Sequence, residues 1–192
     1  IPVLLEPFIS RATYRGLYNL WTMKDYTRHD TTLLQFLRSL PTSSPINIWT
    51  TGHSLGGALA PTLALYIKNI KTDSLRNNQI NVNCLAVAGA TPGDRRFSNY
   101  YNTDVTGGPA MGQNTIRVWN SHDVVPHGYE TDMMAVVDTI YDADTMPVVT
   151  PRYVKDLVYG LIKGLNGLHY NYTQLYPAAD TVFTSAFYSK AN

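Results

Sequence analysis

The pentapeptide GHSLG at residues 52–56 has the residue types and spacing best suited to chemistry in this chain. It fits Gly-x-Ser-x-Gly, in which a sharp turn between a strand and a helix exposes the serine hydroxyl as a nucleophile. We expect Gly52 and Gly56 to be needed because strand and helix approach so closely that Cβ atoms there would clash. The helix N-terminus offers partial positive charge, and the Leu55 N–H is suited to bind a tetrahedral oxyanion.

A second interpretation of Ser54 involves no chemistry. Serine is common at helix N-caps, where its hydroxyl accepts a hydrogen bond from a backbone N–H of the first turn. The glycine-rich turn would then have a purely structural role. The apolar run before the turn and the helical pattern after it favour the nucleophile, because a strand–turn–helix is the context that such an elbow requires.

A serine nucleophile also needs a base to take its proton and an acid to orient that base. When the serine stands in an elbow of this kind, the acid and then the histidine follow it along the chain. Asp123 is the best acid candidate, because it comes just after a predicted strand whose end would present it beside the elbow. Its alternative role is an Asx turn ahead of Pro126. Asp94 also follows a strand, but TPGD at 91–94 is typical of a turn and a helix cap.

The base must come from the five histidines, which are His29, His53, His122, His127 and His169. The first precedes the elbow and the second belongs to it. The next two lie within four residues of Asp123, too close along the chain to face its carboxylate easily. His169 is the base candidate, because it alone has enough intervening chain to return to the site. A structural role for His169 stays open, since a lone histidine is more often structural than catalytic.

The elements that must position these residues alternate between strands and helices. Strands are predicted at 46–52, 82–90 and 114–120, and helices at 31–40, 55–68, 93–102, 131–141 and 151–165. The segment 82–90 is apolar on both faces, which is typical of a buried parallel strand. The alternation indicates an α/β fold with a mainly parallel sheet, in which sites form beyond the carboxyl ends of the strands.

Length and composition restrict the remaining possibilities. The 192 residues fit one domain, and with 44% hydrophobic and 15% charged residues the chain is globular. A net charge of +1 would recruit neither nucleic acid nor an anionic membrane. No apolar run approaches the roughly 18 residues of a membrane span. Cys84 is the only cysteine and is expected in the core, so the sequence is compatible with both a secreted and a cytoplasmic protein.

WTTGHSLGGALAPTLALYI, with AVAGATPGDRRFSNYYN and IRVWNSHDVVPHGY further along the chain, resembles the class 3 lipases, particularly a bacterial subgroup of that family. The resemblance runs from about Tyr14 to Leu175. It implies an α/β-hydrolase fold, with a mainly parallel central sheet flanked by helices, and a triacylglycerol lipase or carboxylesterase that needs no metal or cofactor. By this resemblance Ser54 matches the nucleophile, Leu55 the second oxyanion donor and Asp123 the triad acid.

Two parts of the family pattern have no counterpart in the sequence. Family members carry an Arg-Gly-Thr strand end upstream, and the loop that follows it supplies the other oxyanion donor. We therefore expect residues 1–192 to be a single, incomplete domain that lacks the N-terminal strands. In the bacterial subgroup the catalytic histidine tends to sit late, and HYNYTQLYP at 169–177 resembles the segment before it. The base is thus expected at His169 or beyond Asn192.

Three functions remain open on this reasoning. The first is a serine hydrolase that cleaves lipid-type carboxylic esters through an acyl-enzyme, with Ser54, Asp123 and a histidine as the triad. The second keeps the same serine but transfers the acyl group to an alcohol or lipid. The third is an inactive, lipase-like binding module that retains an acyl-sized pocket. The expected partners are a lipid or small ester substrate and, transiently, a lipid interface.

Overall fold

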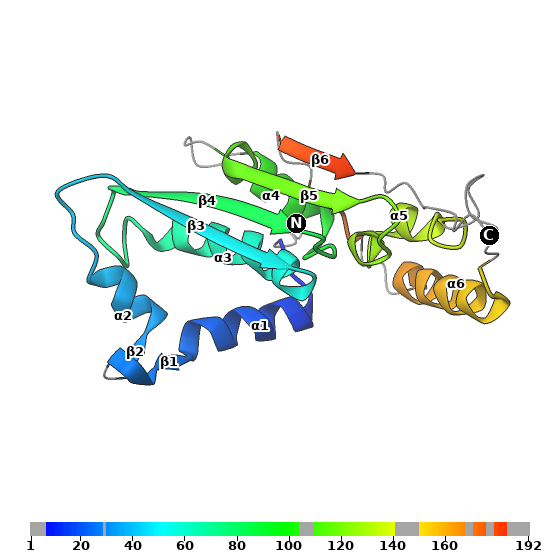
Figure 1. Cartoon of the computed structure of the whole chain (residues 1–192), viewed down its shortest axis with the longest axis horizontal. Helices are drawn as coiled ribbons and strands as arrows, with labels where there is room; N and C mark the ends of the chain where they lie inside the picture. The colour runs from blue at the N-terminus through cyan, green and yellow to red at the C-terminus, as the bar shows by residue number, and fades with distance from the viewer. Residues whose placement is uncertain are drawn as a thin grey trace, which may run out of the picture.

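A parallel sheet forms the centre of the computed structural model, which describes residues 7–28, 30–103, 110–140, 150–167, 171–175 and 179–183. Its four strands are β3 (Ile46–His53), β4 (Ile80–Val87), β5 (Thr115–Asn120) and β6 (Ala179–Phe183), hydrogen-bonded in that order. Each neighbouring pair is parallel. The carboxyl ends of all four strands therefore lie along one edge of the sheet (Figure 1).

The helices surround this sheet unevenly. They are α1 (Arg11–Thr22), α2 (Leu33–Arg38), α3 (Leu55–Ile70), α4 (Arg95–Asn102), α5 (Thr131–Ala135) and α6 (Arg152–Gly167). Short 3-10 turns η1 (Tyr26–Arg28), η2 (Met111–Asn114) and η3 (Val125–His127) and a two-residue antiparallel pair, β1 (Lys24–Asp25) with β2 (Thr31–Thr32), complete the described part. Figure 1 shows α5 and α6 beyond the carboxyl ends of the strands. No helix in these ranges is long and apolar enough to cross a bilayer.

The hydrophobic core lies on one face of the sheet. Alternate residues of β4 point into it, namely Ile80, Val82, Cys84 and Ala86, all of them buried. Helices α3 and α4 contribute to the same core through residues such as Ala64 and Tyr101. Burial raises the pKa of the Cys84 thiol, as expected for a small core residue.

The other face of β4 is less enclosed than its sequence suggests. Asn81 is exposed, and Asn83, Leu85 and Val87 are half-buried. On the neighbouring strand β3, Trp49 is 55% exposed. The prediction that both faces of the segment 82–90 are buried is therefore wrong for the part of the chain that the structure describes.

The predicted strands are otherwise present, with their ends shifted by a few residues. The helix expected at 131–141 ends at Ala135, and its last predicted residue lies outside the described ranges. β6 was not predicted. Its sequence, ADTVF, does not alternate between apolar and polar residues as a half-buried strand does. In the structure all five residues are exposed. The Arg117–Asp180 ion pair, 3.1 Å long, ties this strand to β5.

Two glycines let α3 lie directly on the end of β4. A Cβ on Gly57 would lie 2.7 Å from the Gly89 Cα and would overlap the Val87 carbonyl. A Cβ on Gly89 would lie 2.9 Å from the Ala58 N. Neither position accepts a side chain, because the neighbouring atoms belong to backbone.

Alanine substitutions at the adjacent glycines 56 and 57 are expected to have opposite effects on stability. Gly57→Ala should lower the free energy of unfolding by about 1–3 kcal/mol through overpacking. Gly56→Ala should be neutral or stabilising by up to about 1 kcal/mol, because a Cβ there meets nothing within 4 Å and alanine favours the helix. Urea denaturation of both variants measures the difference. Equal losses would contradict this description of the contact.

Candidate active site

Ser54 occupies a strained turn between β3 and α3. Its backbone angles are φ 58° and ψ −119°, a combination that residues with a side chain rarely adopt. The Ser54 N–H donates a 3.1 Å hydrogen bond to the Val87 carbonyl, which fastens the turn to the end of β4. The Ser54 hydroxyl makes no capping hydrogen bond to the helix. The N-cap interpretation is therefore not supported, and the hydroxyl is not occupied as a cap.

The two elbow glycines differ in their surroundings. A Cβ on Gly52 would lie 2.8 Å from the Gly56 Cα and would overlap the Gly56 carbonyl, as the sequence predicts. A Cβ on Gly56 would meet no atom within 4 Å, so the expected clash there is wrong. The close approach beyond the turn is made by Gly57 instead. The Gly52 Cα–Cβ direction points at the helix, whereas that of Gly56 does not.

Leu55 begins α3 directly after the serine. The N–H of a first helical residue has no acceptor within its helix, so it is available to a ligand at the elbow. The Leu55 side chain is 61% exposed. This arrangement suits the role of oxyanion donor that the sequence assigns to the Leu55 N–H.

Asp123 lies in the loop after β5, which we call the acid loop (residues 123–128). The strands that lead to Ser54 and Asp123 both flank β4 and both end at the same edge of the sheet. One carboxylate oxygen of Asp123 accepts a 3.0 Å hydrogen bond from the Val125 N–H, so the Asx turn is present. Within the described ranges the other oxygen accepts no hydrogen bond. The carboxylate can therefore shape its loop and still accept a bond from a histidine.

The His127 side chain is buried and bonds to the first residue of the acid loop. The residue is 4% exposed, and its Nδ1 lies 2.8 Å from the Asp123 carbonyl oxygen. The ring also meets Trp119 edge-on, with the ring centroids 5.4 Å apart. Burial lowers the pKa of His127 below its ordinary value of 6.5; the bond to the Asp123 carbonyl opposes this effect, and Arg117 adds to it. His127 is thus neutral at pH 7, with its proton on Nδ1.

The positions of the other histidines do not identify the catalytic base. His53 is exposed at the end of β3, and His122 is half-buried, with its backbone N–H on the Asn120 side chain. His29 and His169, the base candidate, lie outside the described residues. Of the residues that are described, no three His, Cys, Asp or Glu side chains gather as a metal site would require.

An apolar groove of about 450 Å³ opens away from this site. Met23, Tyr26, Leu33 and Phe36 are among the residues that line it. These residues follow α1 and begin α2, at the end of the molecule opposite the strand carboxyl ends (Figure 1). The groove therefore lies at the other end of the molecule from the elbow.

Comparison with known proteins gives one family match. The model of the family described as lipase (class 3) matches residues 6–133. Among solved structures, the chain is 29% identical to M37 lipase with a TM-score of 0.80, over 91% of this chain and 49% of that one. The chain thus spans about half the length of M37 lipase. No curated protein matches the sequence.

Two further lipase structures show a more distant similarity. Lipase II from Rhizopus niveus is 23% identical with a TM-score of 0.43, over 65% of this chain and 40% of that one. Rhizomucor miehei triacylglyceride lipase is 22% identical with a TM-score of 0.44, over 67% of this chain and 42% of its own. The fold is an α/β-hydrolase fold, as the M37 lipase similarity and the parallel sheet together show.

The buried His127 should make stability depend on pH. Because its pKa is lower in the folded chain, the unfolded chain binds more protons below about pH 6.5. The free energy of unfolding should therefore fall as the pH drops through 6.5 towards the folded pKa. His127→Asn retains a donor for the Asp123 carbonyl and does not titrate, so it should flatten this slope. His53→Asn, an exposed control, should leave it unchanged. Denaturation at several pH values tests this, and a wild-type slope in His127→Asn would contradict it.

Proposed function

The chain belongs to the class 3 lipase family, and on that basis we propose that it is a serine hydrolase that cleaves lipid-type carboxylic esters. Its activity would be that of a triacylglycerol lipase or carboxylesterase of the bacterial subgroup that the sequence resembles. The observation that carries the proposal is Ser54, which combines a strained backbone, a strand–turn–helix setting and an uncapped hydroxyl. The activity of the whole protein is part of this proposal, because the chain spans about half the length of M37 lipase.

The proposed reaction proceeds through an acyl-enzyme. A histidine takes the Ser54 proton as the serine oxygen attacks the ester carbonyl, and it then protonates the leaving alcohol. Asp123 orients that histidine and stabilises its charged form. The Leu55 N–H binds the oxyanion, where one such donor typically contributes about 3 kcal/mol to lowering the barrier. Water then releases the acid and restores the Ser54 hydroxyl.

The base is proposed to be His169 or a histidine beyond Asn192. The topology is relevant because β6 runs parallel to β5 and ends at the edge that carries Ser54 and Asp123. A histidine that follows β6 in the sequence would therefore lie near the same edge of the sheet as Ser54 and Asp123. No histidine occurs among residues 184–192. His169 precedes β6 and would have to reach the edge from the segment after α6.

We extend the proposal to contact with a lipid surface through α6. Tyr153, Leu157 and Leu161 are spaced four residues apart and are 74%, 62% and 50% exposed. The charged residues of this helix are Arg152, Lys155, Asp156 and Lys163, a net charge of +2. An exposed apolar stripe on a basic helix is typical of helices that lie in a membrane interface. Figure 1 shows α6 beyond the strand carboxyl ends, on the side of the proposed site.

Removing the triad groups one at a time tests the reaction. Ser54→Ala should abolish organophosphonate labelling and lower short-chain p-nitrophenyl ester turnover about 10⁶-fold, and Asp123→Asn should lower turnover about 10⁴-fold. Ser43→Ala, at an exposed loop serine, should match the wild type. Equal labelling of wild type and Ser54→Ala would rule out this nucleophile.

The same assay locates the base. His169→Asn should lower turnover about as much as Ser54→Ala if His169 is the base. Unchanged turnover would assign the base to a histidine beyond Asn192.

Product analysis with added alcohol separates hydrolysis from acyl transfer. No turnover by this chain, or by any longer gene product that contains it, would favour the binding module.

The lipid contact has its own test. Changing Leu157 and Leu161 together to serine should weaken adsorption to a triacylglycerol emulsion at least about tenfold, because both side chains lose apolar burial in the interface. Hydrolysis of a soluble short-chain ester should stay unchanged. Tyr26→Ser, at an 87% exposed site in η1, is the matched control and should adsorb normally. Normal adsorption of the double variant would contradict the α6 assignment.

A further inference from the structure

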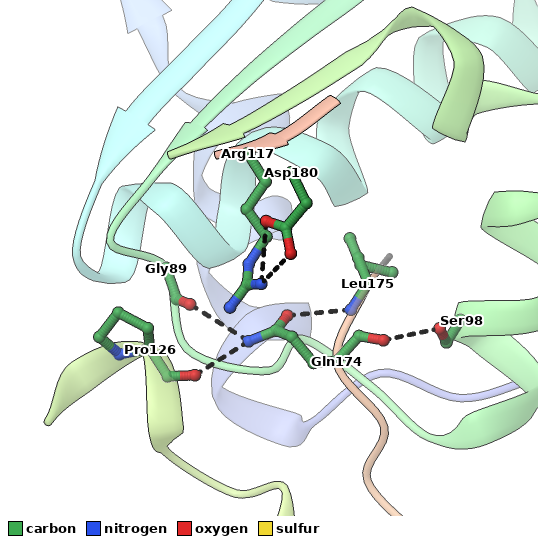
Figure 2. A network of polar contacts seen from close by, with 7 residues as sticks. All are labelled: Gly89, Ser98, Arg117, Pro126, Gln174, Leu175 and Asp180. Carbon is green, nitrogen blue, oxygen red and sulfur yellow. Dashed lines mark hydrogen bonds and ion pairs between the residues drawn. The ribbon is translucent and has the colours of Figure 1, made fainter. Parts of the chain in front are cut away.

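Gln174 is a buried amide beneath the carboxyl edge of the sheet. It lies in the segment 171–175 and is 2% exposed. A buried amide loses its hydrogen bonds to water, so its position is costly unless protein groups replace them. Figure 2 shows the Gln174 side chain directed at Gly89 and Pro126, which belong to the loops that follow β4 and β5.

The Gln174 amide nitrogen bonds to both of these loops. Nε2 donates to the Pro126 carbonyl at 3.1 Å and to the Gly89 carbonyl at 3.4 Å (Figure 2). The other end of the side chain is also used, because Oε1 accepts a 3.0 Å bond from the Leu175 N–H. Both Nε2 hydrogens therefore point at carbonyls of different loops.

Each of these carbonyls leads to a proposed catalytic group. Pro126 lies in the acid loop, between the Val125 N–H that binds the Asp123 carboxylate and the buried His127. Gly89 packs against Gly57, which lies three residues after Ser54 in the elbow helix. One nitrogen atom thus joins the loop that carries the acid to the backbone beneath the nucleophile.

Few other side chains fit this position. Two carbonyl oxygens require two donors on one small group, which a primary amide supplies and a carboxylate or an alkyl chain does not. The adjacent cavity, which Arg117 and Gly57 help to line, has a volume of about 10 Å³. That is no more than about one water molecule needs, so water has little room to replace the amide.

We propose that Gln174 is a positioning residue, which holds Asp123 in register with Ser54 by joining the acid loop to the loop after β4. This inference rests on the proposed function, since it assigns Asp123 and Ser54 to one reaction. It predicts that loss of the two Nε2 bonds misplaces the acid without removing any group that touches substrate. Misplacement of about 1 Å can lower a rate about 100-fold.

Gln174→Met tests the proposal, because methionine has a similar length and no donor. Its kcat on a soluble ester should fall about 10- to 100-fold, with KM changed less than about twofold. The acid limb of its pH profile should move to lower pH, because a more distant Asp123 raises the pKa of the catalytic histidine less. Gln174→Glu has the same size and also lacks the paired donors, so it replaces the methionine variant if that variant does not fold.

Ser98→Ala is the matched control for a merely structural effect. The Ser98 hydroxyl donates a 2.9 Å bond to the Gln174 main-chain carbonyl and so anchors the same segment to α4 (Figure 2). Among the described residues, the Ser98 hydroxyl bonds neither to the acid loop nor to the loop after β4. Its loss should lower Tm and keep kcat within about twofold. If Gln174→Met and Ser98→Ala lower Tm by the same amount and also lower kcat by the same amount, the proposal is overturned.

Hydrogen exchange gives a readout that needs no catalysis. The Val125 and His127 amides donate within the acid loop, at 3.0 Å and 3.2 Å. They should exchange at least about tenfold faster in Gln174→Met and unchanged in Ser98→Ala. Unchanged exchange in Gln174→Met would overturn the positioning role, even in an active enzyme. If the wild-type chain cleaves no ester but the two variants still differ in exchange as expected, only the proposed function is contradicted.

Discussion

The structure depends on a backbone contact without side chains, between the start of α3 and the end of β4. Gly57 and Gly89 meet there, and Gly52 faces the first turn of the helix in the same way. Because the helix lies so close, the chain must reverse within one residue, and Ser54 takes the φ of 58° that the reversal requires. The exposed hydroxyl of Ser54 is thus a consequence of main-chain packing beneath it.

The parallel sheet turns that local contact into a site. All four strands end at one edge, so loops far apart in the sequence meet there without a long connection. Buried polar groups hold these loops, because main-chain carbonyls at the ends of strands need donors. His127 and Gln174 supply them at the acid loop. The groups proposed to react lie at this edge, and the groups that fix their distances lie just below it.

Sequence reasoning pointed to the groups proposed to react more readily than to the residues that support them. The elbow, Asp123 and three strands have local patterns of spacing and polarity, and these were predicted. Gly57 was missed because the fixed motif draws attention to Gly56, although only the structure shows which Cβ direction meets a neighbour. Gln174 has no local signal, since its partners lie 48 and 85 residues away. The Asx turn and the acid role of Asp123 were treated as alternatives, yet one carboxylate has oxygens for both.

The positive φ of Ser54 means that fold stability and chemistry favour different residues at position 54. Glycine adopts such angles without penalty, whereas a residue with a Cβ is strained by about 1–3 kcal/mol. Random drift towards glycine at position 54 would therefore make the fold more robust while it removed the only hydroxyl in the turn. A chain under selection for folding alone would have reason to lose this serine. Its presence at the most strained point of the elbow is what selection for a reactive oxygen would produce.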